Sequence, residues 1–87
     1  MRLSVVIPTR NRPADLRDLL ESLQACVPPP DEIVVADDYQ EADVLGELRA
    51  EFPGVVFERL PERGYMTAAR NAGAWRAGGQ FIFFVDD

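Results

Sequence analysis

The chain has 87 residues, of which 15 are acidic and 9 basic, giving a formal net charge of −6. This length permits one small domain with a modest core, and the acidic balance argues against a nucleic-acid backbone as a partner. Because all the basic residues are arginine, the sequence excludes histidine bases, histidine metal ligands and lysine nucleophiles. Its chemistry must come from carboxylates, arginine, backbone amides or a bound metal ion.

The single Cys26 cannot form an internal disulfide, and we expect it to be a small buried thiol. The sequence shows no disulfide framework, no signal peptide and no segment long enough to span a membrane. We therefore expect this part of the protein to be soluble and cytoplasmic. A parent protein associated with the inner face of the membrane is compatible with this expectation.

Apolar strands alternate with helical patterns along the chain. Strands are expected at residues 3–7, 33–36, 55–57 and 81–85. Stripes at helical spacing predict two helices, one with Leu16, Leu19, Leu20, Leu23 and Val27, the other with Val44, Leu45, Leu48 and Phe52. Pro13 suits the first turn of the first helix, and the run Pro28-Pro29-Pro30 ends it. A third helix is expected over residues 66–77, where small side chains permit close packing on a sheet.

This alternation predicts an α/β fold with helices on both faces of a parallel sheet. The near-continuous apolar strands fit burial on both faces of that sheet. Right-handed crossovers give the strand order third, second, first, fourth, all within one domain covering residues 1–87. The architecture is thus a three-layer α/β/α, Rossmann-like unit with a four-stranded parallel sheet in the order 3-2-1-4.

Polar residues follow three of these strands: Pro8-Thr9-Arg10-Asn11, then Asp37-Asp38, then Asp86-Asp87. In a parallel sheet these ends lie along one edge, which is where open α/β sheets bind ligands. Each group also has a plainer interpretation as a helix cap, a turn or a solvated chain end. Their convergence on one edge favours a ligand crevice.

The segment from Gly64 to Gly73 joins a glycine to the start of a helix, where free N–H groups can bind an anion. It is neither a Walker loop, because Gly-Lys-Ser/Thr is missing, nor the dinucleotide signature, which should follow the first strand. Arg70 within it is either a surface ion-pair residue or a guanidinium aimed at a base or phosphate.

Four stretches, at residues 4–13, 30–38, 69–73 and 79–87, carry a resemblance that covers the whole chain. In their order and spacing the chain resembles the amino-terminal, nucleotide-binding half of family 2 glycosyltransferases, inverting sugar-nucleotide enzymes of GT-A fold. The resemblance implies that Pro8, Thr9 and Arg10 line the nucleotide base. It implies that Asp38 hydrogen-bonds the base, typically uracil, and that Arg70 contacts the base or the phosphates.

The same resemblance makes Asp86 the first acid of a D-x-D motif, near the ribose and the metal, and Asp87 the variable middle position. Mg²⁺ or Mn²⁺ is then the expected cofactor, because hard cations take oxygen ligands and assist departure of the nucleotide. Asp86 and Asp87 would hold the ion weakly, since the third acid would be residue 88. We expect the chain to be the front half of an enzyme, cut within this motif.

Some positions depart from the family pattern. Arg10 stands where the family usually has an aromatic residue, so guanidinium stacking would replace ring stacking on the base. Tyr39-Gln40 replaces the common Gly-Ser after the paired acids. The acceptor-binding half and its general-base carboxylate are missing, so no catalytic residue is assigned within the chain.

We therefore expect a glycosyltransferase fragment that binds a nucleoside diphosphate sugar, with a UDP-sugar as donor and an unknown acceptor, and that is inactive alone. Two alternatives remain open: a stand-alone, non-catalytic nucleotide-binding or interaction module, and an unrelated small α/β domain. The apolar strand from Phe81 to Val85 should form a sheet edge and could support a homo-oligomer by strand pairing.

Overall fold

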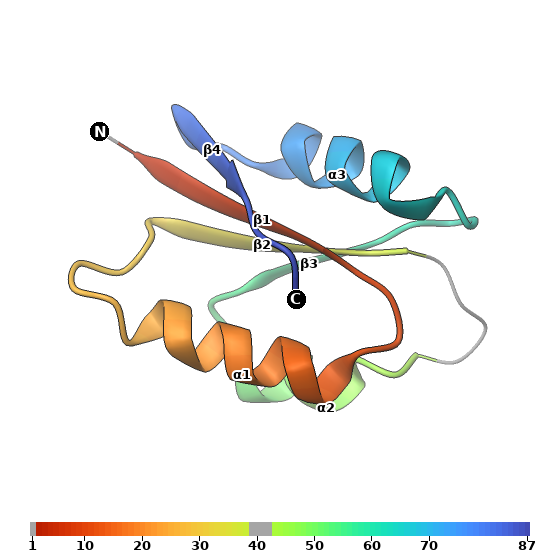
Figure 1. The fold of residues 1–87 in the computed structure, drawn as a ribbon, viewed down its shortest axis with the longest axis horizontal. Helices are drawn as coiled ribbons and strands as arrows, with labels where there is room; N and C mark the ends of the chain where they lie inside the picture. Colours follow the sequence, from red (N-terminus) through yellow and green to blue (C-terminus); the bar gives the residue numbers. More distant parts are fainter. Residues whose placement is uncertain (1, 39–42) are drawn as a thin grey trace.

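The structure, a computed structural model, describes residues 2–38 and 43–87 as four strands and three helices (Figure 1). The elements are β1 (Leu3–Thr9), α1 (Pro13–Gln24), β2 (Glu32–Asp37), α2 (Gly46–Glu51), β3 (Val56–Arg59), α3 (Tyr65–Arg76) and β4 (Phe81–Phe84). All neighbouring strands pair in parallel, in the order β3-β2-β1-β4. Helices α1 and α2 cover one face of the sheet and α3 covers the other (Figure 1). The α/β class, the layers and the strand order expected from the sequence are confirmed.

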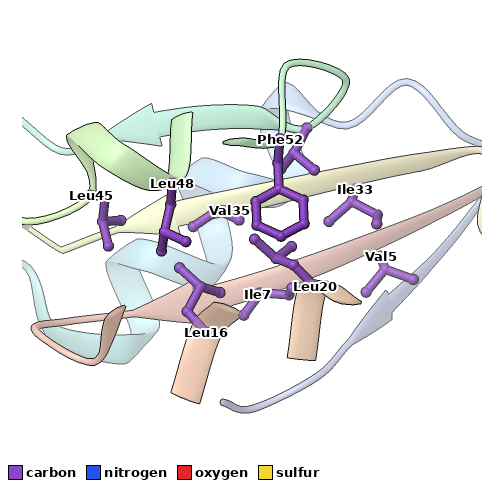
Figure 2. Close-up of a cluster of buried hydrophobic side chains, with 10 residues drawn as sticks. Val5, Ile7, Leu16, Leu20, Ile33, Val35, Leu45, Leu48 and Phe52 are labelled. Carbon is purple, nitrogen blue, oxygen red and sulfur yellow. The ribbon is translucent and has the colours of Figure 1, made fainter. Parts of the chain in front are cut away.

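The main core lies between the sheet and the α1–α2 layer. Alternate residues of β1 and β2 point into it, because successive side chains of a strand face opposite sides. Figure 2 shows these strand residues meeting leucines of both helices and the ring of Phe52. The cluster consists of Val5, Ile7, Leu16, Leu20, Ile33, Val35, Leu45, Leu48, Phe52 and Val55.

On the other face, α3 lies unusually close to the sheet. A Cβ built on Gly73 would stand 2.3 Å from Cγ1 of Val6 and 3.3 Å from Cβ of Ala36. Ala69, one turn earlier, is fully buried against the same strands. The close packing expected from these small residues is confirmed, and it sets how near the start of α3 comes to the sheet edge.

A polar cluster fixes the start of β4 at the amino-terminal edge of the sheet. The Ser4 hydroxyl donates to Oε1 of Glu32 at 2.8 Å and accepts the Gly79 amide at 2.9 Å. The same Glu32 oxygen accepts the Gly78 amide at 2.8 Å, and this hydrogen bond is the main cause that lowers the pKa of Glu32. The turn after α3 is thereby tied to β1 and β2, which places β4 in register beside β1.

Two expectations about the end of the first helix are wrong. The helix ends at Gln24, so Val27 lies beyond its apolar stripe and is 97% exposed. Cys26 is exposed as well, with its thiol donating to the Ser22 carbonyl at 3.4 Å. The physical reason is Pro28, because a residue before proline is driven out of the helical region and the chain leaves the core early.

The other boundaries differ less. The second helix is one short segment, with Leu45 before its first residue and Phe52 after its last, although both are buried as expected. The expectation of burial on both faces fails for β4, where Phe81, Phe83 and Phe84 are about half exposed. That strand is an edge of the sheet, as predicted, and self-association through it stays a prediction.

None of the helices in the described residues is long and apolar enough to cross a membrane.

The close approach of α3 predicts an asymmetry between two glycines. Gly73→Ala should lower the free energy of unfolding by about 1–2 kcal/mol, since overpacking against the stiff Val6 outweighs the better helix propensity of alanine. Gly54→Ala is the control, because a Cβ there meets nothing within 4 Å, and it should change stability by less than about 0.5 kcal/mol. Urea unfolding of both variants checks this; equal effects would contradict the packing described above.

Candidate functional site

A pocket of about 700 Å³ opens at the carboxyl ends of β1, β2 and β4. Its volume lies within the range of roughly 300–1,000 Å³ common for small-molecule sites. The described residues that line it are Pro8, Arg10, Arg12, Asp38, Arg63, Tyr65, Met66, Thr67, Arg70, Asp86 and Asp87. The ends of three strands and the start of one helix therefore meet around a single space.

This pocket brings together nearly all the residues singled out in the sequence. Pro8, Arg10 and Asp38 line it beside Arg70 and the two acids after β4. Thr9 is buried rather than exposed to the space, and its hydroxyl donates to the Asp87 carboxylate. Asn11, which was open to interpretation as a helix cap, forms no cap, because Arg12 holds that position without a side-chain hydrogen bond. The Tyr39-Gln40 departure lies outside the described residues.

Asp38 is a buried carboxylate held in one orientation. Its backbone amide donates to the Thr9 carbonyl at 2.9 Å, which extends the pairing of β1 and β2 by one residue. Its Oδ1 accepts the Gly64 amide at 2.8 Å, and its Oδ2 lies 3.6 Å from Nε of Arg63. A carboxylate oriented in this way is a preorganised acceptor for an N–H group of a ligand.

The acids after β4 are held less tightly. The Val85 amide donates to the Val6 carbonyl at 3.0 Å, so the pairing of β4 with β1 continues to the point where the acids begin. Oδ1 of Asp86 lies 3.4 Å from Nη2 of Arg70, and the Asp86 side chain is 78% exposed. Because the pair is exposed, water and salt screen it, and Asp86 can exchange Arg70 for a ligand at small cost.

Positive charge dominates the rest of the pocket. Among the described residues, four guanidinium groups line it against three carboxylates. The first residues of α3 also line it, and the amides of a first helical turn lack partners within the helix. Arginine forks and a helix amino terminus together favour an anion such as a phosphate group.

Arg12, Arg63 and Tyr65 also line the pocket, although no individual role was expected for any of them from the sequence. Cζ of Arg63 lies 4.2 Å from the centre of the Tyr65 ring. Tyr65 has a φ of 61°, whereas the preceding Gly64 has an ordinary φ of −127°. A left-handed backbone costs a bulky residue roughly 1–3 kcal/mol. Glycine would adopt this conformation without that cost, but here the strained residue is Tyr65, which lines the pocket.

Asp37 is buried like its neighbour Asp38 but differs from it in its contacts and in its position relative to the pocket. It is 2% exposed, does not line the pocket, and its carboxylate has no hydrogen-bond partner among the described residues. Burial raises the pKa of Asp37, against the opposing charges of Arg59 and Arg49. Of the two acids at the end of β2, one therefore lines the pocket, and the other has a carboxylate without a hydrogen bond in the described residues.

Comparison with known proteins assigns this chain to a family. The sequence profile described as glycosyl transferase family 2 matches residues 4–87. The chain belongs to that family. The resemblance noted in the sequence is thereby confirmed at the level of the family.

Two curated relatives of this family 2 chain are bacterial. An uncharacterized glycosyltransferase of Haemophilus influenzae is 33% identical over 85 residues, and the uncharacterized glycosyltransferase YwdF of Bacillus subtilis is 39% identical over 88 residues. The matches cover 98% and 100% of this chain but 29% and 32% of the relatives. The chain therefore spans about a third of the length of these relatives.

Solved structures show the same fold. TarS of Staphylococcus aureus matches with a TM-score of 0.80 at 29% identity, covering 99% of this chain and 16% of TarS. Glucosyl-3-phosphoglycerate synthase of Mycobacterium tuberculosis, in complex with Mn²⁺, UDP and phosphoglyceric acid, matches with a TM-score of 0.76 at 25% identity. That match covers 98% of this chain and 32% of the synthase. The expected likeness to part of a GT-A glycosyltransferase is confirmed.

The raised pKa of Asp37 predicts a pH effect on stability. The folded protein holds this proton more tightly than the unfolded chain, so the contribution of Asp37 to the free energy of unfolding falls as pH rises through the interval between the two pKa values. Asp37→Asn removes that loss. Relative to the parent chain, the variant should gain stability between about pH 4 and pH 7, as the unfolded-state pKa of about 3.9 requires.

Urea unfolding at both pH values measures this difference. Asp18→Asn, which changes an exposed carboxylate on α1, is the matched control and should follow the parent chain at both values. An Asp37→Asn variant that loses stability, relative to the parent chain, as the pH rises would contradict the assigned cause.

Proposed function

We propose that this chain is the donor-binding part of an inverting glycosyltransferase that uses a nucleoside diphosphate sugar, with a UDP-sugar as donor. The observation that carries the proposal is the buried, oriented carboxylate of Asp38 in a pocket otherwise rich in guanidinium groups. One wall is suited to a base with a ring N–H, and the rest is suited to phosphates. Glucosyl-3-phosphoglycerate synthase, a solved structure of similar fold, holds UDP and Mn²⁺, which supports this choice of ligand.

Each residue has a role in this proposal. Asp38 accepts the ring N–H of uracil, while Pro8 and Arg10 line the base and Thr9 supports that wall from beneath. Arg70 contacts the base or the phosphates once it is released from its exposed pair with Asp86. The residues of this chain bind and orient the donor, and the general base and the acceptor site lie in the remainder of a complete family 2 enzyme. Residues 1–87 then form a single donor-binding subdomain.

A divalent cation fits the carboxylates after β4. Asp86 and Asp87 both line the pocket and offer the hard oxygen ligands that Mg²⁺ and Mn²⁺ prefer. No cluster of three potential ligand side chains occurs in the described part of the chain, so diphosphate oxygens would have to complete the coordination. When bound, such an ion supplies charge stabilisation for the departing nucleoside diphosphate.

The nucleotide assignment predicts a loss of affinity when Asp38 changes. Asp38→Asn keeps the shape and one acceptor but loses the charge, so UDP should bind about tenfold or more weakly, as expected for a charge-assisted hydrogen bond. NMR titration should map UDP to residues 8–10, 38 and 70. Asp18→Asn on α1 is the control. Unchanged affinity in the Asp38 variant, or shifts elsewhere, would place the ligand outside this pocket.

The metal assignment predicts coupling between the cation and the nucleotide. Mn²⁺ should bind weakly alone and should tighten UDP binding, because only the diphosphate completes its oxygen ligands. An Asp86→Asn/Asp87→Asn double variant should lose this coupling, so that Mn²⁺ no longer tightens UDP binding. Paramagnetic broadening by Mn²⁺ with and without UDP measures it; broadening centred away from the end of β4 would be inconsistent with the site.

A further inference from the structure

Arg63 is a pocket residue that the donor-binding proposal does not use, although the structure restrains it on two sides. Its Nε lies 3.6 Å from Oδ2 of Asp38, and its Cζ lies 4.2 Å from the centre of the Tyr65 ring. The side chain is 44% exposed, and the structure shows no other hydrogen bond or ion pair of Arg63 within the described residues. The two terminal Nη groups are therefore the donors that remain for a ligand in the pocket.

The restraint places a hydrogen-bond donor directly beside a hydrogen-bond acceptor. Asp38 is fully buried and fixed by the Gly64 amide, so the position of its carboxylate is set by the fold. Arg63 is aligned on that carboxylate through Nε and supported from one side by the Tyr65 ring. Its guanidinium fork is planar and rigid, so orienting one end of it orients the Nη donors as well.

The backbone of Tyr65 agrees with a functional role for this arrangement. Its φ of 61° is a left-handed conformation that a tyrosine rarely adopts. That conformation sets the direction in which the ring leaves the chain, and the ring is what supports Arg63. Strained residues persist where the surrounding structure requires them, and they concentrate at ligand sites.

We propose that Arg63 reads the base of the nucleotide together with Asp38 and determines the preference for uracil. This inference rests on the proposed nucleotide site. Uracil presents its N3–H beside the C4 carbonyl, which matches the acceptor of Asp38 beside the donor of Arg63 if Arg63 faces C4, the position at which cytosine carries an amino group. In the same pose cytosine would present a bare N3 to Asp38 and an amino group to Arg63, and both contacts would be mismatched. Unpaired polar groups at a buried site are what give strong discrimination between similar ligands.

The competing role for Arg63 is a contact with the phosphates, and the choice of ligand separates the two. Uridine has the base without phosphate, UDP has both, and CDP keeps the diphosphate with a different base. A residue that contacts the base affects uridine and UDP by the same factor. A residue that contacts the phosphates affects UDP and CDP but leaves uridine unchanged.

The test is NMR titration of these three ligands into the chain and its variants. Arg63→Met keeps the length of the side chain and removes the donors, so uridine and UDP should both bind about tenfold more weakly, as expected when one charged hydrogen bond is lost. CDP should change by less than about twofold, so the preference for UDP over CDP should fall by a similar factor of about five to ten.

Variants of Tyr65 test the support for the guanidinium. Tyr65→Phe retains the ring and should bind uridine as the parent chain does, whereas Tyr65→Leu removes the ring and should weaken uridine binding severalfold. Arg17→Met is the matched control, since Arg17 pairs with Glu51 outside the pocket and should leave every affinity unchanged. Amide spectra of each variant establish that the fold is retained.

Three outcomes would overturn the inference. Arg63→Met could leave uridine binding unchanged while weakening UDP, which would make Arg63 a phosphate contact. It could leave all three ligands unchanged, which would remove Arg63 from the site. The parent chain itself could fail to bind UDP and uridine, which would overturn the proposed nucleotide site and this inference with it. This outcome is recognised before any variant is made.

Discussion

The distance between α3 and the sheet is the constraint on which the candidate site depends. At Gly73 the helix lies so close to Val6 that a single Cβ would not fit. The same helix begins at the pocket, where its first residues form one wall and Arg70 reaches Asp86 across the opening. A helix raised by a larger side chain would move that wall away from Asp38. The close packing at Gly73 thus also determines the width of the pocket, although Gly73 does not line the pocket.

The two adjacent acids at the end of β2 have opposite effects: Asp38 contributes to the candidate site, whereas burial of Asp37 is unfavourable for its charged form. Successive residues of a strand face opposite sides, so Asp37 and Asp38 cannot both reach the pocket. Oδ1 of Asp38 accepts the Gly64 amide and Oδ2 pairs with Arg63, and these two contacts direct the buried carboxylate. The Asp37 carboxylate gains no hydrogen bond within the described residues, and burial raises its pKa. The free-energy cost of burying the Asp37 carboxylate is reduced by the charges of Arg59 and Arg49. It is also reduced by protonation, which is the usual response of a carboxyl group that is removed from water.

Periodicity and connection rules were sufficient to predict the sheet, because they describe features that repeat along the chain. Apolar strands alternating with helices permit few parallel topologies once crossovers are right-handed, and the observed order is among them. The sequence-based predictions were wrong or incomplete where a single local feature determines the backbone conformation. Pro28 ends the first helix before the apolar stripe does, which exposes Cys26 and Val27. The pocket roles of Arg63 and Tyr65 depend on a left-handed backbone at a tyrosine, and propensities assign that conformation to the neighbouring glycine.

The acidic character of the chain and an anionic ligand are compatible because charges act locally. Dissolved salt screens the interaction between exposed charges over about 8 Å at physiological ionic strength. Acids outside the pocket therefore contribute little to the electric field inside it. Among the described residues, four of the nine arginines line the pocket against three of the fifteen acids. The local balance is therefore the reverse of the net charge of −6. The buried carboxylate of Asp38 and the Tyr65 ring restrain Arg63 before a ligand arrives, so less of its side-chain entropy remains to be lost on binding. Asp38 thus has two functions in the proposed site, as a ligand acceptor and as the buried partner that restrains Arg63.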